Sequence, residues 1–134
     1  SRVDISDPGE YFSPDGNFSV KVSIINVKNP EVNIDLTKKE YIKFLDYDRI
    51  QDSLILRTPE PGDRMVIRSD GAVKKLNRIL SDRKIERTER NKVPVIACGS
   101  EIVWAVGIRI GENYKVTDNT SRIICLEYKE EKNR

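Results

Sequence analysis

Hydrophobic and polar residues alternate along most of this chain, as half-buried β-strands require. The first alternating run covers residues 18–27, and its phase changes at Ile25. This change predicts a β-bulge at Ile25, and Asn29-Pro30 is expected to end the strand. Residues 31–40 fit either a strand or a short helical turn. Further strands are predicted at 41–45, 54–57, 65–67, 94–98, 101–106, 108–110, 114–117 and 122–128.

One segment has helical periodicity instead. Its apolar residues recur at the spacing of one helix face, at Val73, Leu76, Ile79 and Leu80. The other face is basic, with Lys74, Lys75 and Arg78. The preceding Ser69-Asp70-Gly71 is a turn that can also cap a helix. A second, shorter helical turn is expected to continue the positive charge through Arg83, Lys84, Arg87 and Arg90.

The order of these elements predicts an α+β fold: a strand-rich single domain, residues 1–134, with one or two short helices. Residues 1–17 are rich in turn formers and are expected to form a loosely ordered arm. Residues 18–128 form the folded core, and 129–134 are a charged tail expected to fray. Near-continuous apolar character predicts that the 101–106 strand is buried on both faces, with Trp104 as a core residue.

The net charge of +2 hides a basic centre. Residues 57–92 hold 11 Lys and Arg against 6 Asp and Glu, whereas the flanking regions are acidic or neutral. Positive charge on a short rigid element is suited to binding the phosphates of a polyanion, but a solvated helix face has the same composition. Some of this charge should be neutralised by three acidic residues at helical spacing, Asp82, Glu86 and Glu89.

Arg57 and Arg64 flank a Pro-Gly turn, where a guanidinium group could contact phosphate or guanine through two hydrogen bonds. Asp63 lies between them. We expect it to pair with Arg64 or to cap the turn, and contact with an exposed base is the alternative.

The residue types argue against an enzyme. Histidine is absent, and Cys98 and Cys125 lack metal-ligand spacing, so both are expected to be buried thiols of a cytosolic protein. Neither common phosphate-binding glycine loop occurs. No apolar run approaches the ~20 residues that span a bilayer. The first residues lack the pattern of a secretory signal, and the absence of an initiator Met fits either processing or a piece of a longer protein.

Four segments carry a family resemblance: LRTPEPGDRM, AVKKLNRILSDRKIERTERNKVPVI, EIVWAVGIRI and YKVTDNTSR. In this order, over residues 44–126, they resemble the C-terminal domain of tRNA(Ile)-lysidine synthetase. Glu86 stands where many members have Pro, and Ala105 where many have Val. The S-G-G-x-D-S loop of the family's catalytic ATP-pyrophosphatase domain does not occur in this sequence.

The resemblance implies a fold shared with a domain of the phenylalanyl-tRNA synthetase beta subunit. It implies that the parent protein is a bacterial, cytoplasmic ATP-dependent ligase that attaches lysine to the wobble cytidine of isoleucine tRNA, which then decodes AUA. ATP, with Mg, would be bound by an N-terminal catalytic domain absent from these residues. This chain would hold no cofactor and would not be a catalyst by itself.

The resemblance further implies a tRNA-binding accessory role near the acceptor stem. The partners would be isoleucine tRNA, the parent's own catalytic domain and, if the parent is a homodimer, a second copy; no membrane is involved. The expected RNA-binding residues are Arg57, Arg64, Lys74, Lys75, Arg78, Arg83, Lys84, Arg87 and Arg90.

Two other functions stay open. The chain could be a protein-interaction domain that docks the catalytic domain or an acidic partner through its basic face. It could also be a small enzyme that uses carboxylates on a nucleotide, although no paired-carboxylate motif is present.

Overall fold

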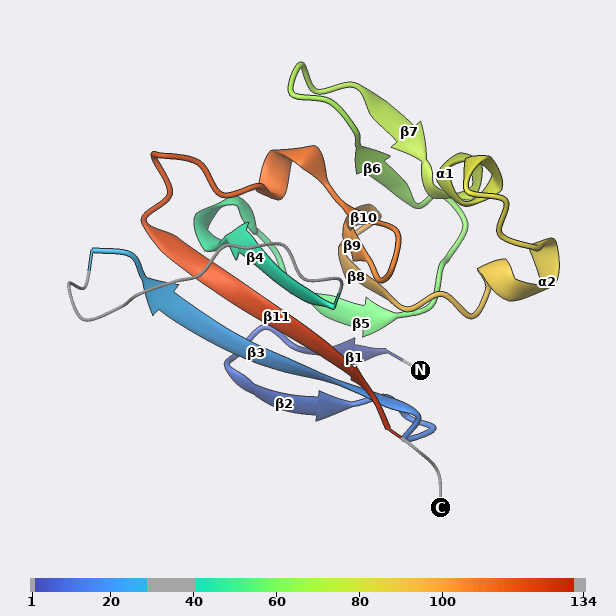
Figure 1. Ribbon diagram of the computed structural model, residues 1–134, viewed down its shortest axis with the longest axis horizontal. Coiled ribbons are helices and arrows are strands. Elements are labelled where there is room, and N and C mark those ends of the chain that lie inside the picture. Colours follow the sequence, from blue (N-terminus) through green and yellow to red (C-terminus); the bar gives the residue numbers. More distant parts are fainter. Residues whose placement is uncertain (1, 29–40, 132–134) are drawn as a thin grey trace.

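The computed structural model describes residues 2–28 and 41–131, which form two β-sheets and two short α-helices (Figure 1). The strands are β1 (Val3–Asp4), β2 (Gly9–Phe12), β3 (Phe18–Asn26), β4 (Ile42–Asp46), β5 (Ile55–Arg57), β6 (Arg64–Val66), β7 (Val73–Lys75), β8 (Val95–Cys98), β9 (Glu101–Ala105), β10 (Arg109–Ile110) and β11 (Arg122–Glu130). The helices are α1 (Leu76–Asp82), α2 (Arg87–Arg90) and the 3₁₀ turns η1 (Tyr47–Arg49) and η2 (Glu112–Tyr114).

The larger sheet has the order β1-β5-β8-β9-β6-β7, with β10 also paired to β9, and the smaller sheet has the order β2-β3-β11-β4. All pairs are antiparallel except β6 with β9. The α+β, strand-rich architecture agrees with the sequence prediction.

Two apolar clusters hold three layers together. In the first, Val22 and Ile124 of the smaller sheet pack with Ile96 and Trp104 of the larger sheet. In the second, the buried residues of α1 pack with the other face of β8 and β9, including Ile102. The β8–β9 hairpin is therefore the central layer and is buried on both faces, as its apolar run predicts. Trp104 is fully buried, which confirms it as a core residue.

The first 17 residues are not a loose arm. Val3 pairs with Leu56, and Gly9 to Phe12 pair with β3. Ile5 is fully buried, so the chain start contributes an edge strand to each sheet. The polar composition of this segment reflects its edge position, where one side of each strand faces water.

The predicted bulge at Ile25 is also wrong. Pairing of β3 with β11 is continuous from Phe18 opposite Glu130 to Asn26 opposite Arg122. Ile25 is half-buried on the second face of the smaller sheet, so the phase change marks a switch of face and not an extra residue. The tail prediction is wrong for 129–130, which lie in β11, and for Glu131, whose backbone N–H donates to the carbonyl of Asn17. Residues 132–134 and the ambiguous 31–40 fall outside the described residues.

The helix at the basic centre starts later than predicted. Val73 to Lys75 form strand β7, paired with β6, and α1 begins at Leu76. Val73 is 54% exposed, so it does not belong to the buried face, whereas Leu76, Ile79 and Leu80 are buried as predicted. The second helix at Arg87–Arg90 is confirmed. At 114–117 the predicted strand is replaced by η2 and one bridge between Lys115 and Leu45.

Leu76 gives a direct test of this core. It is 1% exposed, and Leu76→Ala should reduce the free energy of unfolding by about 2–5 kcal/mol because it leaves a cavity between α1 and the larger sheet. The neighbouring exposed Lys75→Ala is the control and should change stability by about 0.5 kcal/mol or less. Equal, small shifts of the two urea unfolding midpoints would mean that this packing is misassigned.

None of the helices in the described part of the chain is long and apolar enough to cross a membrane.

Candidate RNA-binding surface

Arg57, expected at the rim to contact RNA, is buried instead. Its guanidinium group donates to both carboxylate oxygens of Asp63 at 2.8 Å, and to the carbonyl oxygens of Thr58 at 3.0 Å and Gly99 at 3.1 Å. Only 2% of the Arg57 side chain and 3% of the Asp63 side chain are exposed. Arg57 therefore has no free surface for a phosphate or a base, and that prediction is wrong.

Asp63 connects three parts of the fold. Besides Arg57, its carboxylate accepts a 2.8 Å hydrogen bond from the backbone N–H of Glu60, which confirms the predicted capping of the turn. Its backbone carbonyl accepts from the N–H of Leu76, at the start of α1. Its partner is Arg57 and not Arg64, and its burial rules out contact with an exposed base. The buried pair thus fixes the Pro-Gly turn, the β8–β9 turn and the start of α1.

Arg64 and Lys75 form an accessible basic pair. They are direct partners across the antiparallel strands β6 and β7, so their side chains leave the same face of the sheet. Both are exposed, and neither makes a side-chain hydrogen bond or ion pair with any residue that the structure describes. Two uncompensated cations on neighbouring strands suit contact with adjacent phosphates of one nucleic-acid strand.

Two other predicted residues, Lys74 and Arg78, share one acidic partner. Lys74 pairs with Asp82, and Arg78 lies 3.8 Å from the same carboxylate. The hydrogen bond from Lys74 lowers the pKa of Asp82, so this carboxylate stays ionised at neutral pH. The sequence expectation that acidic residues would neutralise part of the basic centre is confirmed here, and Glu89 does the same for Lys92.

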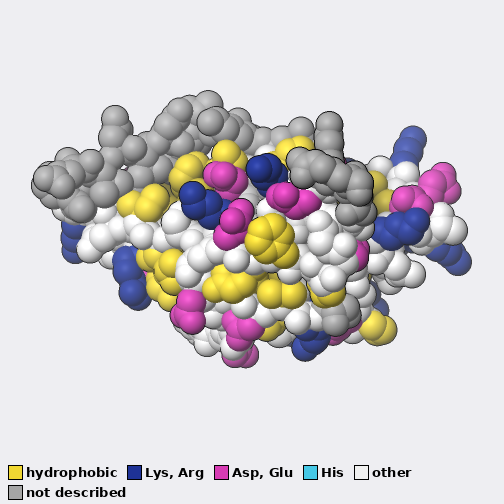
Figure 2. Space-filling model, turned by 90° about the horizontal axis from the view of Figure 1, so that it is seen from below, with side chains coloured by type: hydrophobic (Ala, Val, Ile, Leu, Met, Phe, Trp, Pro, Cys, Tyr) yellow, Lys and Arg dark blue, Asp and Glu magenta, His cyan; other side chains and the backbone are white. Residues whose placement is uncertain are grey.

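The remaining predicted residues lie at the C-terminal end of α1 and on α2. Arg83 donates to the carbonyl of Ile108, and Arg90 donates to the carbonyl of Ile85; both keep their charge, since a carbonyl is neutral. Lys84 and Arg87 are exposed. Contacts of α1 with both β7 and α2 bring these residues to the same end of the molecule as Lys75 (Figure 1). Figure 2 shows basic and acidic side chains interspersed at that end.

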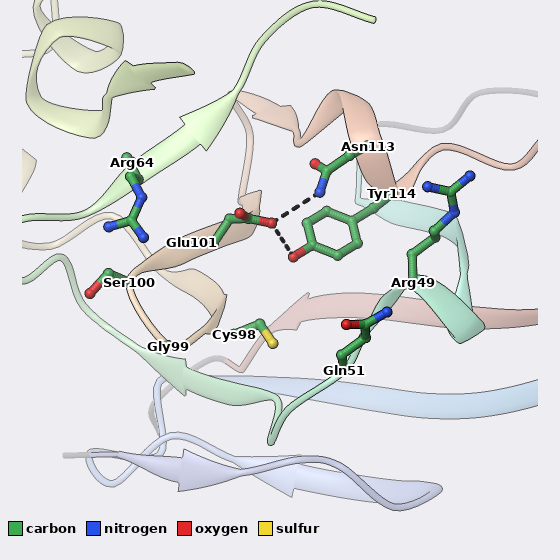
Figure 3. Close-up of a pocket in the computed structure, with 9 residues that line it drawn as sticks. All are labelled: Arg49, Gln51, Arg64, Cys98, Gly99, Ser100, Glu101, Asn113 and Tyr114. Carbon is green, nitrogen blue, oxygen red and sulfur yellow. Dashed lines mark hydrogen bonds between the residues drawn. The ribbon is translucent and has the colours of Figure 1, made fainter. Parts of the chain in front are cut away.

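An open groove of about 470 Å³ lies beside Arg64 (Figure 3). The ends of β8 and β9 with the turn between them, η1 and the loop after it, η2 and β6 supply its lining, which is Arg49, Gln51, Arg64, Cys98, Gly99, Ser100, Glu101, Asn113 and Tyr114. Apart from Arg64, none of these was predicted from the sequence to belong to a site. They come from four separate elements, and no local motif links them.

Glu101 is the central acidic residue of the groove. One of its oxygens, Oε1, accepts hydrogen bonds from the Tyr114 hydroxyl at 2.5 Å and from Asn113 Nδ2 at 3.0 Å (Figure 3). Burial and this hydrogen bond raise the pKa of Tyr114 far above its ordinary value, so the hydroxyl remains a donor. Burial also raises the pKa of Cys98, so its thiol stays neutral and is not an activated nucleophile.

A solved structure with this architecture exists, titled "Crystal structure of TILS C-terminal domain". It superimposes with a TM-score of 0.76 at 22% sequence identity and covers 99% of this chain and 98% of the other. The two chains share one fold over nearly their whole lengths.

The family model "TilS substrate C-terminal domain" matches residues 54–126. The chain therefore belongs to the TilS C-terminal domain family, which confirms the resemblance drawn from the sequence segments.

Several relatives are named tRNA(Ile)-lysidine synthase. That of Caldanaerobacter subterraneus subsp. tengcongensis is 44% identical over 97 residues, which are 72% of this chain and 21% of the relative. That of Clostridium tetani is 34% identical over 117 residues, 87% of this chain and 24% of the relative. The chain thus spans between a fifth and a quarter of the length of these proteins.

Proposed function

We propose that this chain is the tRNA-binding C-terminal domain of a tRNA(Ile)-lysidine synthase and that it positions isoleucine tRNA at the acceptor stem. The names of its relatives and its family membership support a role in tRNA modification. The observation that carries the binding role is the exposed pair Arg64 and Lys75, on directly opposed positions of β6 and β7.

The physical reason is the shape of an RNA stem. An A-form helix hides its base edges in a deep, narrow major groove, so a protein meets mainly phosphates and 2′-hydroxyls. Phosphate contacts require Lys and Arg that are not already engaged with carboxylates. Arg64 and Lys75 fulfil this requirement, and Lys84 and Arg87 extend the accessible charge along the same end of the molecule.

The rest of the proposal concerns the parent protein. The ligase chemistry, with ATP and Mg, would take place in a catalytic domain N-terminal to these residues. This chain would contribute affinity for the tRNA and would position the tRNA relative to that domain. The parent would act in the cytoplasm, would contact this domain through its own catalytic domain and could act as a homodimer.

The test compares the full-length protein with a form that ends before Ser1. We expect the full-length protein to form lysidine from ATP, lysine and isoleucine tRNA, and the shortened form to show a raised KM for tRNA with its KM for ATP unchanged. The isolated 134-residue chain should form no lysidine under the same conditions. Equal KM values for tRNA in the two forms, or robust product from the isolated chain, would contradict the proposal.

One observation favours the docking alternative. Lys74, Arg78 and Lys92 are engaged with Asp82 or Glu89, which lowers the charge available to RNA and leaves charges of both signs that a complementary protein surface could match. Under that alternative the shortened form would bind tRNA as tightly as the full-length protein. The isolated chain would then bind the shortened form in trans but not tRNA.

A further inference from the structure

The groove beside Arg64 holds opposite charges that do not neutralise each other. Arg64 is the Cα partner of both Lys75 on β7 and Glu101 on β9, and Glu101 is in turn the partner of Cys98 on β8. These four side chains therefore form a row on one face of the larger sheet. Although Arg64 and Glu101 are neighbours in this row, no ion pair joins them, and Figure 3 shows them pointing apart.

The groove also presents a hydrogen-bond acceptor that has no donor, and a second unpaired acceptor is buried behind it. Both bonds to Glu101 go to Oε1, and Oε2 has no partner among the described residues. Asn113 Oδ1 is buried and unpaired as well. Its amide is oriented by the bond from Nδ2 to Glu101, so the carbonyl oxygen cannot turn without losing that bond. Glu101 Oε2 is open to the groove, so a ligand that supplies an N–H group would satisfy it, whereas Asn113 Oδ1 is enclosed by the protein.

The ends of the groove are basic and require a ligand group that is negatively charged. Arg64 lies on one side of Glu101 and Arg49 on the other (Figure 3). Arg49 is 62% exposed, and its nearest carboxylate, of Asp46, is 4.0 Å away. The groove thus combines cations at its ends with a carboxylate at its centre. A ligand that fits must carry both an anionic group and an N–H donor.

We infer that this groove takes one unpaired nucleotide of the bound RNA. An amino or imino N–H group of its base donates to Glu101 Oε2, and its phosphate contacts Arg64. This inference rests on the proposed function, because Lys75 and Arg64 hold the backbone that leads into the groove. A stem phosphate alone does not fit there, since Glu101 would repel it.

Size and chemistry agree with this ligand. About 470 Å³ lies within the ~300–1,000 Å³ that ligand sites commonly occupy. Sequence-dependent recognition of RNA is directed mostly at unpaired bases, whose hydrogen-bonding edges are accessible. Adenine, cytosine and guanine each offer an amino group, whereas uracil offers one imino N–H between two carbonyl oxygens, which a carboxylate repels. The site should therefore discriminate against uridine.

The experiment uses the 134-residue chain and two short RNA hairpins, one fully paired and one with a single unpaired cytidine. The chain should bind the second about tenfold more tightly, as expected for a hydrogen bond to a charged group. Glu101→Gln should abolish this preference and leave affinity for the paired hairpin unchanged. Glu86→Gln is the matched control, because Glu86 is exposed and its side chain makes no capping bond; it should keep the preference.

A second measurement does not depend on the folding of a variant. In NMR titrations of the unsubstituted chain, cytidine 5′-monophosphate should shift the amide signals of Gly99, Glu101 and Asn113 more than uridine 5′-monophosphate does. Equal affinity for both hairpins, or stronger shifts with free lysine than with the nucleotide, would overturn the inference while leaving stem binding intact. Loss of binding to both hairpins would instead overturn the proposed function as well.

Discussion

Replacing Arg57 by alanine is expected to lower the free energy of unfolding by about 3–5 kcal/mol, because it leaves the buried carboxylate of Asp63 without its cation. The bonds to Thr58 and Gly99 would be lost in the same step. Urea denaturation of the variant and the unsubstituted chain measures the difference. Arg68→Ala is the control: Arg68 pairs with Asp70 on the surface and should contribute about 1 kcal/mol or less.

A double substitution separates the contribution of the ion pair from the cost of leaving one charge buried alone. Changing Arg57 to Met and Asp63 to Leu together should cost less than either single change, since no unpaired charge is then buried. Hydrogen bonding to Asp63 raises the pKa of Arg57 above an already high value, so the charge on Arg57 is present throughout the neutral range and is lost as the pH rises to strongly alkaline values. A cost below about 1 kcal/mol for Arg57→Ala would contradict this role of the pair.

Arg57→Ala should also affect the groove indirectly. Arg57 holds the Gly99 carbonyl in the β8–β9 turn, and Asp63 directly precedes Arg64. The buried pair therefore positions two walls of the groove without touching its interior. Arg57 and Asp63 thus have a structural role, and neither is available for RNA.

The sequence predicted strands well because alternation is a local property. The β8–β9 hairpin, β3 and β11 each bury one face or both, and their apolar residues show this directly. The later start of α1 could not be predicted from the local pattern of apolar residues. Val73 stands at helical spacing from Leu76 and Leu80, yet β7 pairs with residues of β6 that lie seven to eleven positions earlier in the chain. Pairing between strands, which local periodicity does not show, determined the structure there.

The candidate site was only partly visible in the sequence for a similar reason. Charge composition correctly located a basic centre, and Arg64 and Lys75 are accessible within it. The same composition gave no indication that Arg57 is buried, because burial of a charge depends on a partner that the fold supplies. Glu101, Asn113 and Tyr114 were missed because their contacts form only when η2 packs beside β9.

Changing Arg64 and Lys75 together to alanine should weaken binding of isoleucine tRNA without unfolding the domain, because both side chains are exposed and unpaired within the described residues. Loss of two phosphate contacts should flatten the slope of log affinity against log salt by about 2, by analogy with duplex DNA. The measurement is a titration of the full-length protein with tRNA at several salt concentrations.

Two comparisons make this result specific. Lys21→Ala with Lys129→Ala removes the same charge from the smaller sheet, where both side chains are exposed, and should leave the slope nearly unchanged. Lys74→Ala with Arg78→Ala should flatten the slope less than the Arg64 and Lys75 changes, since Asp82 already neutralises part of that charge. If the Arg64 and Lys75 changes left affinity and slope at their original values, the RNA would bind elsewhere on the protein. The basic end of the domain would then be better explained as the surface that docks the catalytic domain.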